Sequence, residues 1–196
     1  MFIPPAFRLD DVTACQQVLT DHPFMLLIDR GPAAELTHLP LTLVADEGEF
    51  GTLYGHVARG NGHAASIAEG HAQTVVAMGP HAYISPTWYP APERNVPTWN
   101  YVVVHADGVP EPLGDPLPVL RDLSARYEAT WRPDLLAPKQ LHALASAILA
   151  FRVPIRTLSG KAKLSQNRSA EDRASLAAGL AQRPDPMDQA VAALMR

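Results

Sequence analysis

The stretch Trp99-Asn-Tyr-Val-Val-Val-His-Ala106 is the part of the sequence that decides the fold. Side chains along it alternate, so that Tyr101, Val103 and His105 point to one face and the residues between them point to the other. This alternation predicts a β-strand over residues 99–106. A strand needs partners, and the sequence on either side contains several further candidates.

Short apolar runs separated by turn residues predict more strands on the N-terminal side. They cover residues 24–28, 36–44, 53–58, 74–78 and 83–85. Pro40 interrupts the second run, which indicates a sheet edge, a bulge or backbone that faces a ligand. Gly79-Pro80 is expected to end the fourth run. Helices are predicted from Asp10 or Asp11 to Leu19 and over residues 64–69.

Helical spacing dominates on the C-terminal side, over residues 119–131 and 139–149. A strand follows over residues 151–158, with arginines on its outer face. Ser169 begins a capping-box-like start for a helix to about Ala181, and a last short helix starts near Met187. Strands follow one another with few long helical crossovers. We therefore predict an α+β fold, with an antiparallel barrel or sheet and peripheral helices.

Composition excludes several classes of protein. The chain has 196 residues, of which 47% are hydrophobic and 18% charged, so an intrinsically disordered chain is excluded. Its net charge of −4 argues against a polycation that grips nucleic acid by charge alone. One cysteine, Cys15, permits no internal disulfide and is expected in the buried face of the first helix. No apolar run reaches the ~20 residues that a bilayer requires, and the N-terminus lacks a secretory signal, so we expect a soluble cytoplasmic protein.

Charge is divided unevenly along the chain. Residues 1–134 contain 7 bases and 16 acids, whereas residues 135–196 contain 9 bases and 4 acids. Between Leu135 and Ala170 there are six bases and no acid. This basic segment is either a solvated face or a site for an anion such as phosphate or a nucleic-acid backbone.

Common catalytic and metal motifs are missing. There is no P-loop, no GxGxxG after a strand and no GxSxG. None of the eight histidines pairs at i, i+4, so no metal site is predicted. Catalytic residues stay unassigned, although His38, His56 and Tyr101 are the candidates for proton transfer if the protein is an enzyme.

Three kinds of segment carry residues suited to a ligand. Arg59, at the end of an apolar strand, suits a phosphate because its planar fork makes two charge-assisted bonds; the alternative is an ion pair with an acid such as Glu69. The segments at residues 83–89 and 96–101 hold aromatic rings beside hydroxyls and an amide, which suits a flat heteroaromatic ligand, core packing or a dimer interface. The segment at residues 160–168 offers an anion cradle or a solvated basic loop.

These segments resemble the PaiB family of FMN-binding negative transcriptional regulators. The resemblance begins at Met1-Phe-Ile-Pro-Pro-Ala-Phe7 and covers essentially the whole chain. The other matching segments are Thr37-His-Leu-Pro40, Gly55-His-Val-Ala-Arg59, Tyr83-Ile-Ser-Pro-Thr-Trp-Tyr89, Val96-Pro-Thr-Trp-Asn-Tyr101 and Lys163-Leu-Ser-Gln-Asn-Arg168. One departure is Gly62, which stands where the family usually has proline.

The resemblance implies an FMN-binding split β-barrel of Greek-key type, as in pyridoxamine-phosphate-oxidase-like flavoproteins. It implies a single domain over residues 1–196, with most of the barrel in 1–110 and helices plus the strand region 151–168 in 119–196. It also implies a homodimer with FMN at the subunit interface. The expected cofactor-binding residues are Thr37, His38, Leu39, Pro40, His56, Val57, Ala58, Arg59, Asn61, Trp88, Thr98, Trp99, Asn100, Lys161, Lys163, Ser165 and Gln166.

Three functions follow from this resemblance. The first is a negative transcriptional regulator or a flavin-based redox or metabolite sensor. Its partners are a second copy of the chain and DNA, although the last helix carries only Arg196 as a base and suits phosphates poorly. The second is an FMN-dependent oxidoreductase, and the third is a heme-handling protein on the same barrel.

Overall fold

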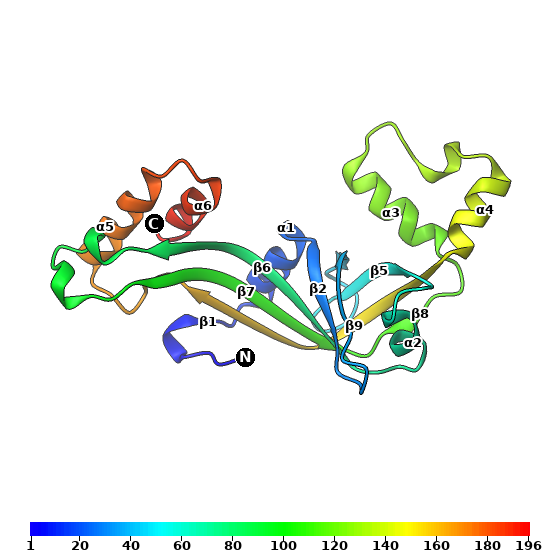
Figure 1. The fold of residues 1–196 in the computed structure, drawn as a ribbon, viewed down its shortest axis with the longest axis horizontal. Helices are drawn as coiled ribbons and strands as arrows, with labels where there is room; N and C mark the ends of the chain where they lie inside the picture. The colour runs from blue at the N-terminus through cyan, green and yellow to red at the C-terminus, as the bar shows by residue number, and fades with distance from the viewer. The chain divides into compact units, whose positions relative to one another are not determined.

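The computed structural model describes the whole chain, residues 1–196, as two compact units (Figure 1). The first unit comprises Met1–Val18, Met78–Val104 and Ser159–Arg196, and the second comprises Leu19–Ala77 and His105–Leu158. Three strands contribute residues to both units: β6 (Gln73–Ile84), β7 (Thr98–Gly108) and β9 (Ile148–Lys163).

The second unit is built on an antiparallel sheet in which the strand order is β3-β2-β6-β7-β9-β5-β4. Strand β8 pairs with β9 outside this path. The strands not yet given are β2 (Phe24–Asp29), β3 (Leu36–Pro40), β4 (Thr42–Val44), β5 (Thr52–Ala58) and β8 (Glu111–Pro112). Strand β3 is at the edge of this sheet and pairs with β2 from Phe24↔Pro40 to Ile28↔Leu36. Pro40 therefore lies at the end of an edge strand, which is one of the positions predicted for it because proline has no backbone N–H.

The core of the second unit lies on one face of β9. Phe151 and Val153 are fully buried and Ile155 is nearly so, while Arg156 is exposed, which confirms the predicted alternation. On the opposite face Arg152 forms ion pairs with Glu47 (3.1 Å) and Glu111 (2.7 Å).

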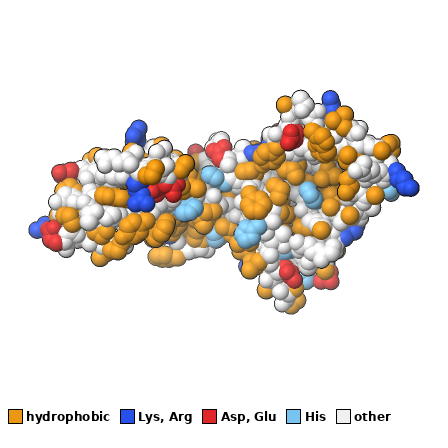
Figure 2. Space-filling view, turned by 45° about the horizontal axis from the view of Figure 1, so that its top comes forward, with side chains coloured by type: hydrophobic (Ala, Val, Ile, Leu, Met, Phe, Trp, Pro, Cys, Tyr) orange, Lys and Arg blue, Asp and Glu red, His pale blue; other side chains and the backbone are white.

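Helices of the second unit fill the connections between strands. Helix α2 (His63–Ala68) follows β5, and α3 (Leu117–Tyr127), η4 (Pro133–Leu135) and α4 (Pro138–Ser146) form an excursion between β8 and β9 (Figure 1). Helix α3 packs near β5. This excursion leaves several apolar side chains exposed, and orange side chains are scattered over its surface in Figure 2.

The first unit packs helices against the outer parts of β6 and β7. Its further elements are η1 (Pro5–Phe7), β1 (Arg8–Leu9), most of α1 (Val12–Asp21), η2 (Pro86–Trp88), η3 (Pro92–Arg94), α5 (Ala170–Ala181) and α6 (Pro186–Leu194). Its core includes Ile84, Val102, Leu176, Leu180 and Val191. Ser169 Oγ accepts a hydrogen bond from the backbone N–H of Asp172 (3.1 Å), so the predicted N-cap is confirmed.

Several predicted element boundaries are wrong. The helix predicted over residues 119–131 ends at Tyr127. Gly79-Pro80 does not end a strand, because β6 runs unbroken from Gln73 to Ile84. The pairing between β2 and β6 stops at Val76, so Pro80 lies where the missing N–H costs no bond to β2. The predicted helix over residues 139–149 ends at Ser146, and the apolar residues from Ile148 begin β9 instead.

The antiparallel α+β architecture confirms the predicted fold class, and Cys15 is buried in α1 as expected. Strand β9 is twice as long as predicted, since it continues through the basic segment to Lys163. The division of a single domain at residues 110–119 stays a prediction. No helix in the structure is both long enough and apolar enough to cross a bilayer.

Replacing Phe151 by alanine tests the importance of the core face of β9. Phe151 is 0% exposed, so Phe151→Ala is expected to lower the free energy of unfolding by about 3–5 kcal/mol through lost burial and a residual cavity. Phe24, which is 67% exposed, provides the matched control, and Phe24→Ala is expected to cost less than about 1 kcal/mol. Urea unfolding measures both; equal losses would contradict this assignment of the core.

Candidate functional site

Two predicted ligand residues of the second unit, Thr37 and Asn61, belong to a group of polar side chains that are in hydrogen-bond contact. Thr37 lies on β3, and its Oγ1 is 2.7 Å from Nδ1 of His63 and 3.3 Å from Oδ1 of Asn61. Asn61 Oδ1 also accepts a hydrogen bond from the backbone N–H of His63 (2.9 Å), which fixes the loop between β5 and α2. Two predicted residues, Thr37 and Asn61, are therefore neighbours joined through His63, which the sequence analysis did not single out.

A buried polar network lies behind Thr37. Asp29 Oδ1 accepts hydrogen bonds from Ser66 Oγ (2.6 Å) and Gln73 Nε2 (3.2 Å). Gln73 Nε2 also donates to Ser66 Oγ (2.8 Å). Asp29, Ser66, Gln73 and His63 are all buried, with His63 0% exposed. The signal that could have revealed them is a set of polar residues at the ends of apolar strands and in α2, but they are distant in sequence.

Hydrogen bonding decides the charge of Asp29. Burial alone would raise its pKa, but hydrogen bonds from Ser66, the Gly31 N–H and Gln73, together with nearby His71, outweigh burial and lower the pKa. His63 behaves differently, because burial lowers the pKa of its imidazole although Asp29 and Glu35 act in the opposite direction. The network thus favours an ionised carboxylate beside a neutral imidazole.

Arg59 follows β5 and is exposed. Its Nε donates to the backbone oxygen of Ser146 (2.9 Å), and its own N–H donates to the oxygen of Ala147 (2.9 Å). The alternative of an ion pair with Glu69 is wrong, since Glu69 lies 3.3 Å from His71 and Arg59 forms no ion pair. Fixing Nε leaves the two terminal amines of Arg59 available to a ligand.

Arg59 also lines a cavity of about 570 Å³. The cavity lies against the ends of α3 and α4, and its lining includes Asp115, Leu141, His142 and Ser146. This volume is within the range, of order 300–1,000 Å³, that is usual for small-molecule sites.

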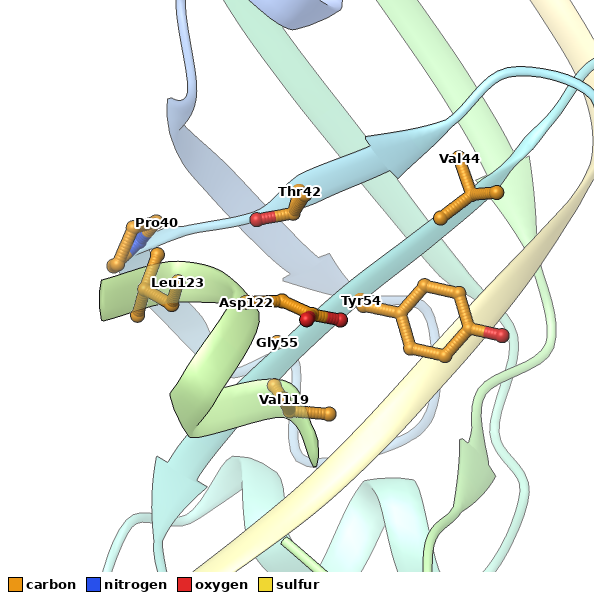
Figure 3. Close-up of a pocket in the computed structure, with 8 residues that line it drawn as sticks. All are labelled: Pro40, Thr42, Val44, Tyr54, Gly55, Val119, Asp122 and Leu123. Atoms are coloured by element: carbon orange, nitrogen blue, oxygen red, sulfur yellow. The ribbon is translucent and has the colours of Figure 1, made fainter. Parts of the chain in front are cut away.

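Pro40, another predicted residue, borders a smaller cavity of about 240 Å³ (Figure 3). Its walls are Pro40, Thr42, Val44, Tyr54 and Gly55 from the strands, and Val119, Asp122 and Leu123 from α3. The Tyr54 hydroxyl donates to both carboxylate oxygens of Glu47, at 3.0 and 2.7 Å, so it is committed to that partner.

The remaining predicted residues of the second unit differ in exposure. Leu39 and Val57 are buried in the core, whereas His38 and Ala58 are exposed. His56 is half-buried, its Nδ1 is buried without a partner, and burial lowers its pKa. A buried ring nitrogen without a partner is an available hydrogen-bonding group.

In the first unit, the predicted residues cluster on β7 and the end of β9. Asn100 is fully buried and donates to Ser165 Oγ (3.0 Å). Ser165 has a φ of 64°, so the chain turns away there and is not extended as far as this serine. Gln166 holds this turn, since its side chain donates to Ala162 O (2.5 Å) and accepts from the N–H of Leu164 (2.7 Å).

Two lysines lie on one face of β9 beside aromatic rings. Lys163 Nζ donates to Thr98 Oγ1 (2.8 Å) and to the backbone oxygen of Trp99 (2.5 Å). Lys161 Nζ lies 5.1 Å from the centre of the Tyr101 ring. Burial and then the charges of Lys161 and Arg168 lower the pKa of Lys163. These three cations form no ion pair, so the cluster is suited to an anion.

The predicted aromatic residues divide into two roles. Trp88 packs on α5, where a Cβ at Gly179 would approach its ring to 2.8 Å, and Tyr89 is buried, so both belong to the packing of this unit. Trp99 is 53% exposed and meets Tyr83 edge to face, with ring centres 6.0 Å apart. Trp99 and Tyr83 remain available to a ligand or a second chain.

The structure thus brings Thr37 and Asn61 together in the second unit and Asn100 with the lysine pair in the first, while Arg59 lines a separate cavity of the second unit. Thr37, Asn61 and Arg59 belong to the second unit, and Asn100 with the lysine pair belongs to the first. The donors fit a flavin mononucleotide, because each unit offers at least one cation without an ion-pair partner for a phosphate, Arg59 in one and the lysine pair in the other, and polar side chains for a heteroaromatic edge.

Comparison with known proteins agrees with this chemistry. A family model described as "Putative FMN-binding domain" matches residues 1–157. A relative from Bacillus subtilis, "Protease synthase and sporulation protein PAI 2", is 28% identical over 204 residues, which cover 100% of this chain and 96% of the relative. The chain belongs to the PaiB family of FMN-binding proteins. The predicted family and the predicted cofactor, FMN, are confirmed.

Solved structures of similar fold support the split barrel of this family. An FAD- and heme-binding protein from Mycobacterium smegmatis matches with a TM-score of 0.60 at 18% identity, over 88% of this chain and 80% of that one. A conserved hypothetical protein from Mycobacterium tuberculosis matches with a TM-score of 0.58 at 10% identity, over 85% of this chain and 92% of that one. The predicted split-barrel fold class is therefore confirmed.

Asp29→Asn tests the buried network of this flavin-binding protein. A carboxylate with a lowered pKa in the folded state stabilises the fold above its unfolded pKa, about 3.9, and this contribution is lost as the pH falls through the folded pKa. Asp29→Asn is therefore expected to cost about 1.5–3 kcal/mol at pH 7 and progressively less below about pH 4. Urea unfolding at several pH values measures this. Exposed Asp46→Asn is the control, and a pH-independent loss in Asp29→Asn would contradict the prediction.

Proposed function

We propose that this flavin-binding protein is a homodimeric regulator or flavin-based sensor of the PaiB type, in which Arg59 binds the phosphate of FMN. The observation that carries the proposal is the arrangement of Arg59. One guanidinium nitrogen is fixed by Ser146 O, and the side chain lines a cavity of about 570 Å³. A guanidinium held in this way binds phosphate at a lower entropic cost than a free side chain.

The ring of FMN is assigned to the segment from Thr37 to Pro40, with His56 and Asn61 beside it. Thr37 is half-buried and His38 is exposed, so this segment is in part accessible from the surface. The unpartnered Nδ1 of His56 supports a further hydrogen bond to the ligand. Bound FMN supplies electron-transfer or hydride chemistry, and these residues bind and orient it.

The lysine pair of the first unit is the second candidate for the phosphate. Lys163 lies among like charges that lower its pKa, and an anion would relieve this repulsion. Lys163 already makes two hydrogen bonds, however, whereas the terminal amines of Arg59 have no protein partner. We therefore assign the phosphate to Arg59 and use Lys163 as the competing variant.

The regulatory role rests on the relative whose name refers to protease synthesis and sporulation. Helix α6 contains no lysine or arginine, and the bases on the face drawn in Figure 2 are scattered. Direct reading of DNA by a basic helix is therefore disfavoured, and regulation through the bound flavin is the form of the proposal that we adopt. A salt-dependent shift of a DNA fragment by the purified protein would instead indicate direct binding.

An FMN-dependent oxidoreductase is the second candidate function. The small cavity beside Pro40, about 240 Å³, would admit a small substrate next to the segment assigned to the ring. Bleaching of the flavin by NADH or NADPH, followed by reoxidation, would favour this activity over sensing. A Soret band in place of flavin bands would favour heme.

Arg59→Ala tests the assignment of the phosphate. Loss of a charge-assisted contact worth about 1.5–3 kcal/mol is expected to weaken FMN binding about 10- to 150-fold. Exposed Arg156→Ala is the control and is expected to bind FMN like the wild type. Fluorescence titration with FMN and with riboflavin, which lacks the phosphate, measures both. If Arg59→Ala binds FMN with unchanged affinity and Lys163→Gln binds it more weakly, the phosphate site must instead be assigned to the first unit.

Trp99→Glu tests the proposed homodimer. Light scattering of the wild type is expected to give twice the chain mass of 21.2 kDa. Trp99 is 53% exposed beside Tyr83, and a charge at this apolar position is expected to weaken self-association. Trp131→Glu, at another exposed tryptophan, is the control. A strictly monomeric wild type would contradict the dimer.

A further inference from the structure

Helices α5 and α6 pack against each other in the first unit, and a further cavity of about 470 Å³ lies beside them (Figure 1). Its volume is in the range, of order 300–1,000 Å³, that is usual for small-molecule sites. None of the residues assigned above to FMN lines it. We call it the α5–α6 cavity, and its lining consists of Ala170, Arg173, Ala174, Ala177, Ala178, Met195 and Arg196.

The apolar part of this lining comes mainly from α5. The alanines recur at helical spacing, so one face of the helix presents methyl groups to the cavity. Met195, which is 3% exposed, adds a thioether. No lining side chain carries a hydroxyl, an amide or a carboxylate. Most of a ligand in this cavity therefore has to be apolar, because nothing is present to bind a polar edge.

Arg173 is held in place at the cavity by the end of α6. Its Nη2 donates to the backbone oxygen of Met195 (2.9 Å), one of the carbonyls that a helix end leaves without a partner. Its Nε is buried and has no partner, and its Nη1 forms no hydrogen bond. Capping of α6 thus explains one of the three guanidinium nitrogens. It also fixes the guanidinium and leaves Nη1 as a donor for a ligand.

The charge of the cavity is positive. Arg173 and Arg196 both line it, and neither forms an ion pair. The acids of the first turn of α5, Glu171 and Asp172, are not among the lining residues. Guanidinium groups bind carboxylates and phosphates well. A singly charged anion is favoured over a doubly charged phosphate, because these two acids stand on the same turn as Arg173 and repel the larger charge more strongly.

We propose that the α5–α6 cavity binds a small organic monocarboxylate, with its carboxylate at Arg173 and Arg196 and its apolar body against the alanine face of α5. Met195, which fixes Arg173, is itself fixed, since Asn100 Nδ2 donates to its Sδ (3.4 Å). Groups positioned before the ligand arrives bind it at a lower entropic cost. The inference does not rest on the assignment of FMN, because Arg59 belongs to the other unit.

Calorimetric titration of the full chain tests the class of ligand. The probes are benzoate and 3-methylbutanoate, with benzamide as the neutral counterpart of benzoate and inorganic phosphate as an anion without an apolar body. At least one carboxylate is expected to bind with a Kd of order 0.1–1 mM, and benzamide and phosphate are expected to bind at least about 10-fold more weakly. Binding of neither carboxylate, or equal binding of phosphate, would overturn the proposal.

Variants of α5 test the location of the site. Arg173→Gln is expected to weaken carboxylate binding at least about 10-fold, although the glutamine amide can still donate to Met195 O. Ala174→Leu is expected to abolish binding by filling the cavity, and its exposed position lets the helix accept the larger side chain. Arg156→Gln, an exposed arginine of the other unit, is the matched control and is expected to bind like the wild type. If Arg173→Gln does not fold, exposed Arg196→Gln takes its place.

The outcomes separate this inference from the proposed function. Arg59→Ala is expected to lose FMN affinity and to keep carboxylate affinity, and Ala174→Leu is expected to do the reverse. Carboxylate binding that is weakened by Arg59→Ala and unchanged by Ala174→Leu would assign the carboxylate to the cavity of Arg59 and overturn the inference. A wild type that binds a carboxylate through Arg173 but does not bind FMN would support the inference and overturn the proposed function.

Discussion

The backbone hydrogen bonding of β9 is the constraint on which the rest of the structure depends. This strand pairs with β5 from Ala58↔Ile148 to Thr52↔Pro154, with β8 at Glu111↔Arg152, and with β1 at Arg8↔Lys161. A shift of one residue would exchange its faces, so the burial of Phe151 and Val153 also determines its register. The same register aligns His56 and Ala58 on β5, and Arg59 directly follows them.

Core residues and proposed binding residues therefore lie on the same strands, and the sequence distinguishes them only in part. Regular alternation predicted β7 and the core face of β9, because period-two burial is a local signal. Local signals failed at Pro80, where the neighbouring strand decides whether the missing N–H matters. They failed again after Ser146, where the pairing of Ile148 with Ala58 outweighs the helical spacing of the preceding residues.

The candidate site was predictable to a similar extent. Arg59 and Lys163 were predicted from their chemistry in short motifs, and Thr37 was predicted from the family resemblance. Asp29, His63 and Gln73 were not predicted, because only their contacts in the folded chain mark them as part of a polar site. They come from β2, α2 and β6, and no spacing along the chain shows that a carboxylate, an imidazole and an amide meet behind Thr37. Trp88 was predicted from a ligand-like motif, and its packing on Gly179 of α5 is likewise a contact between distant parts of the chain.

Asp29 and His63 show how two buried titratable groups can keep opposite charge states in one core. Burial disfavours the charged form of both side chains. Hydrogen bonds outweigh burial at Asp29 and lower its pKa, so the carboxylate stays ionised. At His63 burial is the largest effect and lowers the pKa, so the imidazole stays neutral. The two groups also respond to acid in the same direction, because a lowered pKa in each makes protonation unfavourable for the folded state. Acid therefore weakens the folded state of this unit through both buried groups, the carboxylate by losing its charge and the imidazole by gaining one.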